Sequence, residues 1–187
     1  MTMAGASDPR AQPPPRERRW LPVVIVTMLL LVVAGGARSV ADATATTAGP
    51  VAMGPVRVQP TEGWQVDGSV TPSFVRLHKG PVVLDITVGQ PVAGGPVALA
   101  ALYREQQLEP AFSRLLPGLP EPAVLPTGVP AAGFAYLAAR ADGVVLDGRV
   151  VAADAPNAAV IFDVRAPTGE LTGVIEDVRT MIDGATL

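Results

Sequence analysis

An uninterrupted apolar stretch near the N-terminus constrains this chain more than any other feature. Residues 20–37 contain no charged side chain, and Pro22 falls in the first turn, where the missing N–H would be unpaired anyway. As a helix the stretch would be about 27 Å long, close to the hydrocarbon core of a bilayer. We therefore predict one transmembrane helix over 20–37. Its anchoring side chains are Trp20, Leu21, Val23, Val24, Ile25, Leu29, Leu30, Leu31, Val32 and Val33.

Charge on the two sides of this stretch predicts its orientation. Four arginines and two acidic residues precede it, whereas only Arg38 and Asp42 follow closely. The positive-inside bias then places the N-terminus in the cytoplasm and the C-terminal bulk outside the cell membrane. The alternative is a secreted protein, because the small residues Ser39-Val40-Ala41 before Asp42 resemble a signal-peptidase site. Both interpretations export the C-terminal part.

The rest of the chain divides into two polar segments and one domain. Residues 1–19 have no apolar periodicity and three consecutive prolines, which predicts a disordered basic cytoplasmic tail. Residues 38–54 are small and polar, as in a flexible linker. Residues 55–187 are long enough to bury the core of one extracytoplasmic domain. The chain has no cysteine, which excludes disulfides, a lipobox anchor and thiolate metal sites.

Hydrophobic periodicity predicts six strands and two helices in this domain. Alternation indicates strands at 56–59, 73–77, 82–88, 133–140, 144–153 and 158–165, and helical spacing indicates helices at 97–109 and 168–183. Five prolines between 117 and 130 predict an extended surface loop. Asp142-Gly143 favours a hairpin, and strands joined by hairpins are antiparallel. The element order βββαβββα then predicts an α+β fold, with an antiparallel sheet of about six strands and packed helices.

Three short segments carry a resemblance to a known family. They are Gly63-Trp64 after the first predicted strand, the Gly-Val-Pro-Ala sequence at 128–131 before Phe134, and the end of the last predicted helix at 178–184. Residues 55–187 resemble the PsbP-like fold, and within it the exported actinobacterial LpqN/LpqT and DcrB-like groups. LpqN/LpqT members are lipoproteins, whereas this chain lacks the cysteine. The resemblance implies an accessory or adaptor role in envelope complexes and carries over no catalytic residue.

The residues themselves show no signature of catalysis. The single histidine, His78, sits on a predicted turn without a nucleophile beside it, and the pair Glu105 and Glu109 is interpreted as solvated helix surface. No phosphate-binding loop or metal-binding spacing occurs in the sequence. We therefore expect no enzymatic activity, no cofactor and no metal. From residue 38 onward ten basic residues face fifteen acidic ones, which argues against nucleic acid as a partner.

Charged residues on the predicted strands provide the one candidate site. If their strands are neighbours, these side chains form a mixed-charge sheet face, either a solvated surface or a protein-binding face. We expect a membrane-anchored adaptor that docks onto a larger envelope complex, such as secretion, respiratory or cell-wall machinery. The alternative is a module that binds a lipid or another apolar ligand between sheet and helices. The six residues are Arg76, Asp85, Asp147, Arg149, Asp163 and Arg165.

Overall fold

The computed structural model describes residues 49–187. The predicted cytoplasmic tail, the predicted anchor at 20–37 and most of the predicted linker lie outside the described residues, so they stay predictions. Within 49–187 no helix is both long and apolar enough to cross a membrane.

Eight strands form one antiparallel sheet with the order β3-β4-β5-β10-β9-β8-β6, in which β7 also pairs with β8. They are β3 (Gln65–Asp67), β4 (Phe74–Lys79), β5 (Val82–Gly89), β6 (Arg114–Pro117), β7 (Glu121–Val124), β8 (Pro130–Ala139), β9 (Val145–Ala155) and β10 (Ala158–Pro167). The antiparallel α+β architecture predicted from the sequence is therefore confirmed, whereas the predicted number of strands was too low.

Three short strands at the two edges of the sheet, β3, β6 and β7, were not predicted and account for the difference in number. β6 and β7 lie one after the other along the same side of β8, within or beside the segment predicted as a loop. Proline is compatible with an edge strand because its missing N–H removes no ladder bond on the open side. The predicted strand at 56–59 becomes β2 (Val56–Val58), which leaves the main sheet and pairs with β1 (Val51–Met53). β1 falls inside the predicted linker, so the folded domain begins earlier than residue 55.

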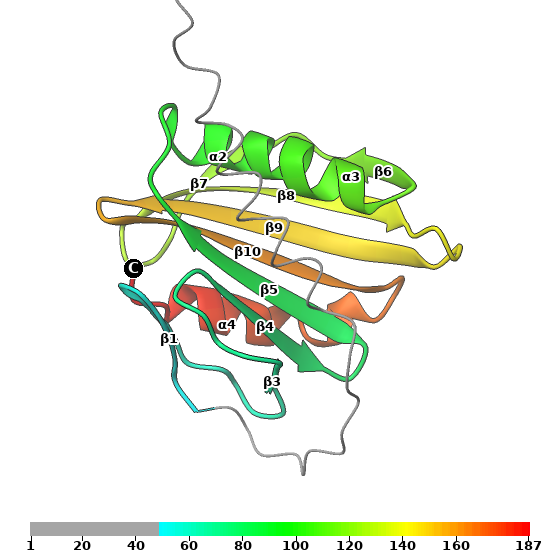
Figure 1. Cartoon of the computed structure of the whole chain (residues 1–187), viewed down its shortest axis with the longest axis horizontal. Helices are drawn as coiled ribbons and strands as arrows, with labels where there is room; N and C mark the ends of the chain where they lie inside the picture. The colour runs from blue at the N-terminus through cyan, green and yellow to red at the C-terminus, as the bar shows by residue number, and fades with distance from the viewer. Residues whose placement is uncertain (1–48) are drawn as a thin grey trace, which may run out of the picture. The chain divides into compact units, whose positions relative to one another are not determined.

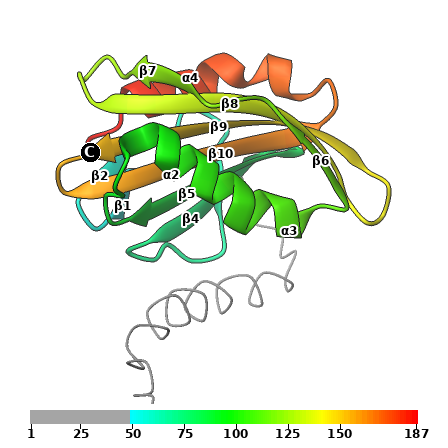
Figure 2. The same ribbon diagram turned by 90° about the horizontal axis from the view of Figure 1, so that it is seen from above.

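Two helical segments cover opposite faces of the sheet (Figures 1 and 2). Helix α2 (Gly95–Tyr103) continues through a π-helix, η1 (Arg104–Leu108), into α3 (Glu109–Ala111), and α2 packs on β8 and β9. On the other face, the 3₁₀ turn η2 (Leu171–Gly173) precedes α4 (Ile175–Asp183). The last helix starts later than predicted because Gly169 has a left-handed φ of 92°, which no α-helix can include.

Each helix covers its own hydrophobic core, and strand β10 contributes to both. Val160, Phe162 and Val164 point to the face that carries α4, whereas Ala159 and Ile161 point to the face that carries α2. Residues 158–164 are therefore apolar almost throughout, as expected of a strand buried on both sides. We call the two sides the α4 face and the α2 face. Each helix covers only part of its face, so some strand residues beside the helices remain exposed to solvent.

Candidate functional site

The six charged residues predicted to share one face lie on two. In the register of the sheet, Asp163 is opposite Asp85 and Asp85 is opposite Arg76, so these side chains lie on the α2 face, together with Arg165. In contrast, Arg149 is opposite Val164 and Asp147 is opposite Ala166, which places both on the α4 face. The prediction of one mixed-charge face is corrected to a group of four and a separate pair.

On the α2 face the four residues form a continuous ionic ladder across β4, β5 and β10. Arg76 donates from Nε and Nη2 to the two carboxylate oxygens of Asp85 at 2.6 and 2.9 Å. Arg165 donates from Nη2 to Asp85 at 2.6 Å and from Nη1 to Asp163 at 2.7 Å. Asp85 is 6% exposed and Asp163 is fully buried. Buried charges are tolerated only when they are paired and hydrogen-bonded, and each of these four is paired.

Two tyrosines complete the ladder at its buried end. The Tyr136 hydroxyl donates to Asp163 Oδ1 at 2.7 Å, and the Tyr103 hydroxyl donates to Oδ2 at 2.9 Å. Tyr136 is opposite Gly148 in the sheet, and a Cβ on Gly148 would overlap the Tyr136 ring. Gly148 thus leaves the room in which this ring crosses β9 to reach β10. The ladder with its two tyrosines, which we call the ionic network, links β4, β5, β8 and β10 to α2.

The pKa values in this network follow from burial and pairing. Burial raises the pKa of Asp85, but the hydrogen bond from Arg76 and the charges of Arg165 and Arg76 outweigh it and hold that pKa below the usual 3.8. Burial raises the pKa of Asp163, against the charge of Arg165 and the hydrogen bond from Tyr136. Burial and the Asp163 carboxylate raise the pKa of Tyr103 and of Tyr136, so both phenols stay protonated as donors. The arrangement suits a structural cross-link, since its donors and acceptors are occupied by one another.

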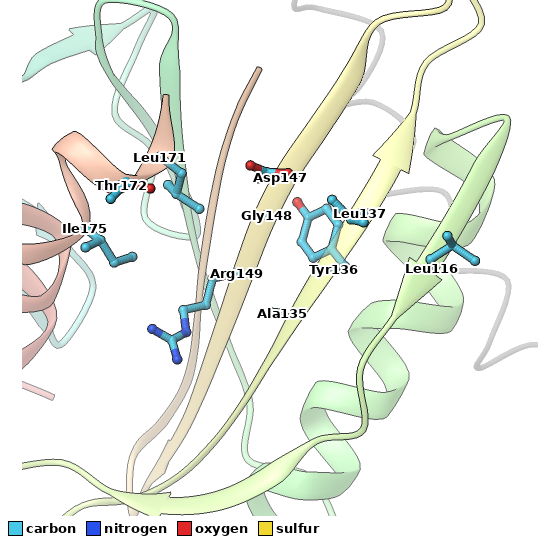
Figure 3. A pocket seen from close by; sticks show the side chains of 10 residues that line it. All are labelled: Leu116, Ala135, Tyr136, Leu137, Asp147, Gly148, Arg149, Leu171, Thr172 and Ile175. Carbon is cyan, nitrogen blue, oxygen red and sulfur yellow. The ribbon is translucent and has the colours of Figure 1, made fainter. Parts of the chain in front are cut away.

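On the α4 face the surface beside α4 is hollowed. Two adjoining hollows of about 440 and 420 Å³ lie between the sheet and the segment from η2 to α4, the first against β6, β8 and β9 and the second against β7, β9 and β10. Both are lined by Arg149 and Ile175. Figure 3 shows the first of them. We call the two hollows together the α4 groove. The first is lined by Leu116, Ala135, Tyr136, Leu137, Asp147, Gly148, Arg149, Leu171, Thr172 and Ile175. The second is lined by Ala123, Leu125, Arg149, Val151, Phe162, Val164, Ile175, Glu176, Val178, Arg179, Ile182 and Asp183.

The open side of the α4 groove exposes large apolar side chains. Leu116 on β6 is 62% exposed, and its partner across the ladder, Leu137 on β8, is 46% exposed. Val145 on β9 is also exposed and lies opposite Ala139, which shares a face with Leu137. Leu116 and Leu137 are directly opposite each other, and Val145 lies diagonally from Leu137, while Asp147 and Arg114 occupy the remaining positions of these two rows on the same face. The α4 groove thus combines exposed apolar strand residues with the two charged residues Asp147 and Arg149.

Sequence reasoning did not find Tyr103, Tyr136, Gly148 or the exposed leucines of the groove. Two signals pointed to the ionic network. An aspartate inside the apolar run at 158–164 is a buried polar group that needs partners, and a glycine inside a strand pattern marks a close approach of another group. Across residues 49–187 no group of three or more His, Asp or Glu side chains is placed to hold a metal ion.

Comparison with known proteins finds similar solved structures but no similar sequence. No protein-family profile matches the sequence, and no curated protein is detectably similar to it. The PsbP protein of the cyanobacterium Synechocystis (CyanoP) superposes with a TM-score of 0.55 at 10% identity, over 80% of this chain and 97% of that protein. LpqN of Mycobacterium tuberculosis, described as involved in cell envelope biogenesis, superposes with a TM-score of 0.51 at 12% identity, over 73% of this chain and 88% of LpqN.

A third similar structure extends the range of known roles. The Ran-binding protein Mog1p of Saccharomyces cerevisiae superposes with a TM-score of 0.50 at 9% identity, over 73% of this chain and 93% of Mog1p. At these identities the similarity concerns the fold alone. The expectation of a PsbP-like fold with LpqN-like relatives is thereby confirmed.

Proposed function

We propose that this chain is a non-enzymatic, membrane-anchored accessory protein whose outer domain docks onto a larger complex of the cell envelope, such as secretion, respiratory or cell-wall machinery. The observation that carries the proposal is the exposed apolar pair Leu116 and Leu137, which line the α4 groove from directly opposite positions on β6 and β8. Single exposed apolar side chains are ordinary, whereas adjoining ones on a sheet mark an interaction site. Because β8 is hydrogen-bonded to β9 on one side and to β6 on the other, this surface is held in place before a partner arrives.

Two further observations support a docking role. One solved structure with this fold belongs to a Ran-binding protein and another to a protein involved in cell envelope biogenesis, so both protein binding and an envelope-related role occur among proteins of this fold. This is an analogy at the level of the fold. The predicted anchor at 20–37 and the predicted outward orientation of the domain supply the location. In this proposal the N-terminus is cytoplasmic and the domain lies outside the cell membrane.

Affinity purification of the full-length protein from its native membrane in a gentle detergent, followed by mass spectrometry, tests this function. We expect stoichiometric recovery of a membrane assembly. Leu137→Asp should lose the assembly, because a charge in the apolar surface opposes burial. Val70→Asp is the matched control, since Val70 is 43% exposed and lies between β3 and β4, outside the groove. Recovery of the wild-type protein alone would overturn the proposal.

A second candidate function is a binding module for a lipid or a small apolar ligand. The observation that favours it is the hollow of about 420 Å³ between α4 and the strands, where Val151, Phe162 and Ile175 supply an apolar lining. This volume lies in the range of known small-molecule sites. Recovery of the protein alone with a co-purifying lipid would support this candidate. A melting temperature that lipids leave unchanged would exclude it.

A further inference from the structure

Arg149 occupies the centre of the α4 groove. The two hollows that make up the groove have only Arg149 and Ile175 in common, so this guanidinium stands where they join. On one side lie Leu116, Leu137 and Ala135, and on the other lie Val151, Phe162 and Leu125. The groove therefore offers apolar surface on both sides of Arg149. Other charged residues also line it, with Asp147 in the first hollow and Glu176, Arg179 and Asp183 in the second.

The charged groups that line the groove with Arg149 form no ion pair with it in the part of the chain that the structure describes. On β9 itself, the Asp147 carboxylate accepts a hydrogen bond from the Gly169 N–H at 3.0 Å, and Figure 3 shows it pointing away from the Arg149 guanidinium. On α4, Asp183 is 3.6 Å from Arg179. Glu176, also on α4, lines the same hollow. Among the described residues, Arg149 forms no ion pair.

An arginine in such surroundings suits a carboxylate from another molecule. The planar guanidinium binds a carboxylate through two parallel hydrogen bonds, and arginine is among the residues that dominate binding at protein interfaces. Covering the groove with a partner would remove water from this pair and strengthen it. The exposed leucines along the open side would let a segment of a larger molecule lie across both hollows.

We propose that the α4 groove receives an apolar segment of the partner protein that carries one aspartate or glutamate, and that this carboxylate pairs with Arg149. The apolar side chains on either side of the carboxylate fill the two hollows. This inference rests on the proposed function, because it specifies the chemistry of the docking partner. It specifies the charges at the interface: the positive charge is on this chain and the negative charge is on the partner.

Photo-crosslinking of the full-length protein in its native membrane tests the inference. A photoreactive amino acid replaces Leu137, or Val70 as the control position outside the groove. We expect a discrete product from position 137 that maps by mass spectrometry to an apolar partner segment containing Asp or Glu, and no such product from position 70. Arg149→Glu should lower the yield roughly 30-fold or more, because it replaces the ion pair by two like charges.

Three controls separate binding from folding. Arg57→Glu reverses an exposed arginine on β2, outside the groove, and should leave the yield unchanged. The melting temperature of Arg149→Glu should equal that of the wild-type protein. Replacement of the mapped partner carboxylate by arginine should restore the yield with Arg149→Glu, since the charges are then exchanged.

Several outcomes would overturn the inference. They are a product formed only with lipid or with a second copy of this chain, a partner segment without a carboxylate, an unchanged yield with Arg149→Glu, and a charge exchange that fails to restore the yield. A membrane assembly that still co-purifies with Arg149→Glu would refute the inference and leave the proposed function standing. Absence of any assembly with the wild-type protein would refute the proposed function itself.

Discussion

Arg165 and Arg149 lie on neighbouring strands of one sheet, yet their surroundings on the two faces are opposite. Arg165 is enclosed between Asp85 and Asp163 on the α2 face, with two tyrosines behind it. Arg149 lies on the α4 face, in a groove where no described residue pairs with it. A charge that is buried within the protein must be neutralised within the protein, whereas an exposed charge remains available to a partner. The comparison separates a structural site from the proposed recognition site.

The largest effect is expected when Arg165 is removed. Arg165→Met leaves the carboxylates of Asp85 and Asp163 buried without their shared counter-ion, so the free energy of unfolding should fall by about 3–5 kcal/mol. Urea unfolding of the full-length protein measures this, with the fluorescence of the buried Trp64 as one probe of the domain. A loss below about 1 kcal/mol would show that the ionic network contributes little to stability.

A smaller loss is expected at Gly148. In Gly148→Ala the new methyl group overlaps the Tyr136 ring and displaces its hydroxyl from Asp163, which should cost about 1–3 kcal/mol. Gly89→Ala is the matched control, because Gly89 ends strand β5 and has open space where a Cβ would stand. In a Tyr136→Ala background the cost of Gly148→Ala should shrink. Additive costs would contradict the proposed contact between ring and glycine.

Acid weakens the same network gradually. The pKa of Asp85 is lower in the folded protein than its usual 3.8, so its stabilising contribution is complete above that value and is lost as the pH falls through the folded pKa. Asp163, whose pKa burial raises, contributes with the opposite sign, so the test must isolate Asp85. Between roughly pH 5 and pH 3, unfolding free energies of the wild-type protein should fall more steeply than those of Asp85→Asn. Parallel curves would contradict the lowered pKa.

The smallest effect on stability is expected at Arg149. Arg149→Met removes an exposed charge that pairs with no residue of the range 49–187, so the free energy of unfolding should change by less than about 0.5 kcal/mol. The same urea unfolding measures it beside Arg165→Met, which has the same chemical change on the other face. A loss comparable to that of Arg165→Met would mean that Arg149 has an internal role and would remove the distinction between the two faces.

Local patterns predicted the elements that depend on neighbouring residues. The alternation in β8, β9 and β10, the Asp142-Gly143 turn and the apolar stripe of α4 all lie within short stretches of sequence, and the structure contains the corresponding strands, turn and helix. The edge strands β6 and β7 were missed because their prolines are acceptable only on an open edge. Being an edge is a property of the whole sheet, which a local pattern does not contain.

The candidate site was predicted only in part, for a related reason. Alternation along β10 shows that Asp163 and Arg165 share a face, and alternation along β9 shows the same for Asp147 and Arg149. Whether the two pairs meet depends on the register between β9 and β10, in which Asp163 is opposite Val150. A shift of one residue would have brought them together, because successive side chains point to opposite faces.

By itself, the sequence determined an α+β domain with a PsbP-like antiparallel sheet and the residue types available for a site. Periodicity and turn chemistry are local, and local physics suffices for them. Only the tertiary structure decided which charges within residues 49–187 are paired and which, Arg149 among them, are not. It set the register between strands, placed α2 over one part of one face and α4 over part of the other, and thereby enclosed Arg165 and exposed Arg149. Burial and pairing depend on groups far apart in the chain, and for that reason two arginines on neighbouring strands have opposite surroundings.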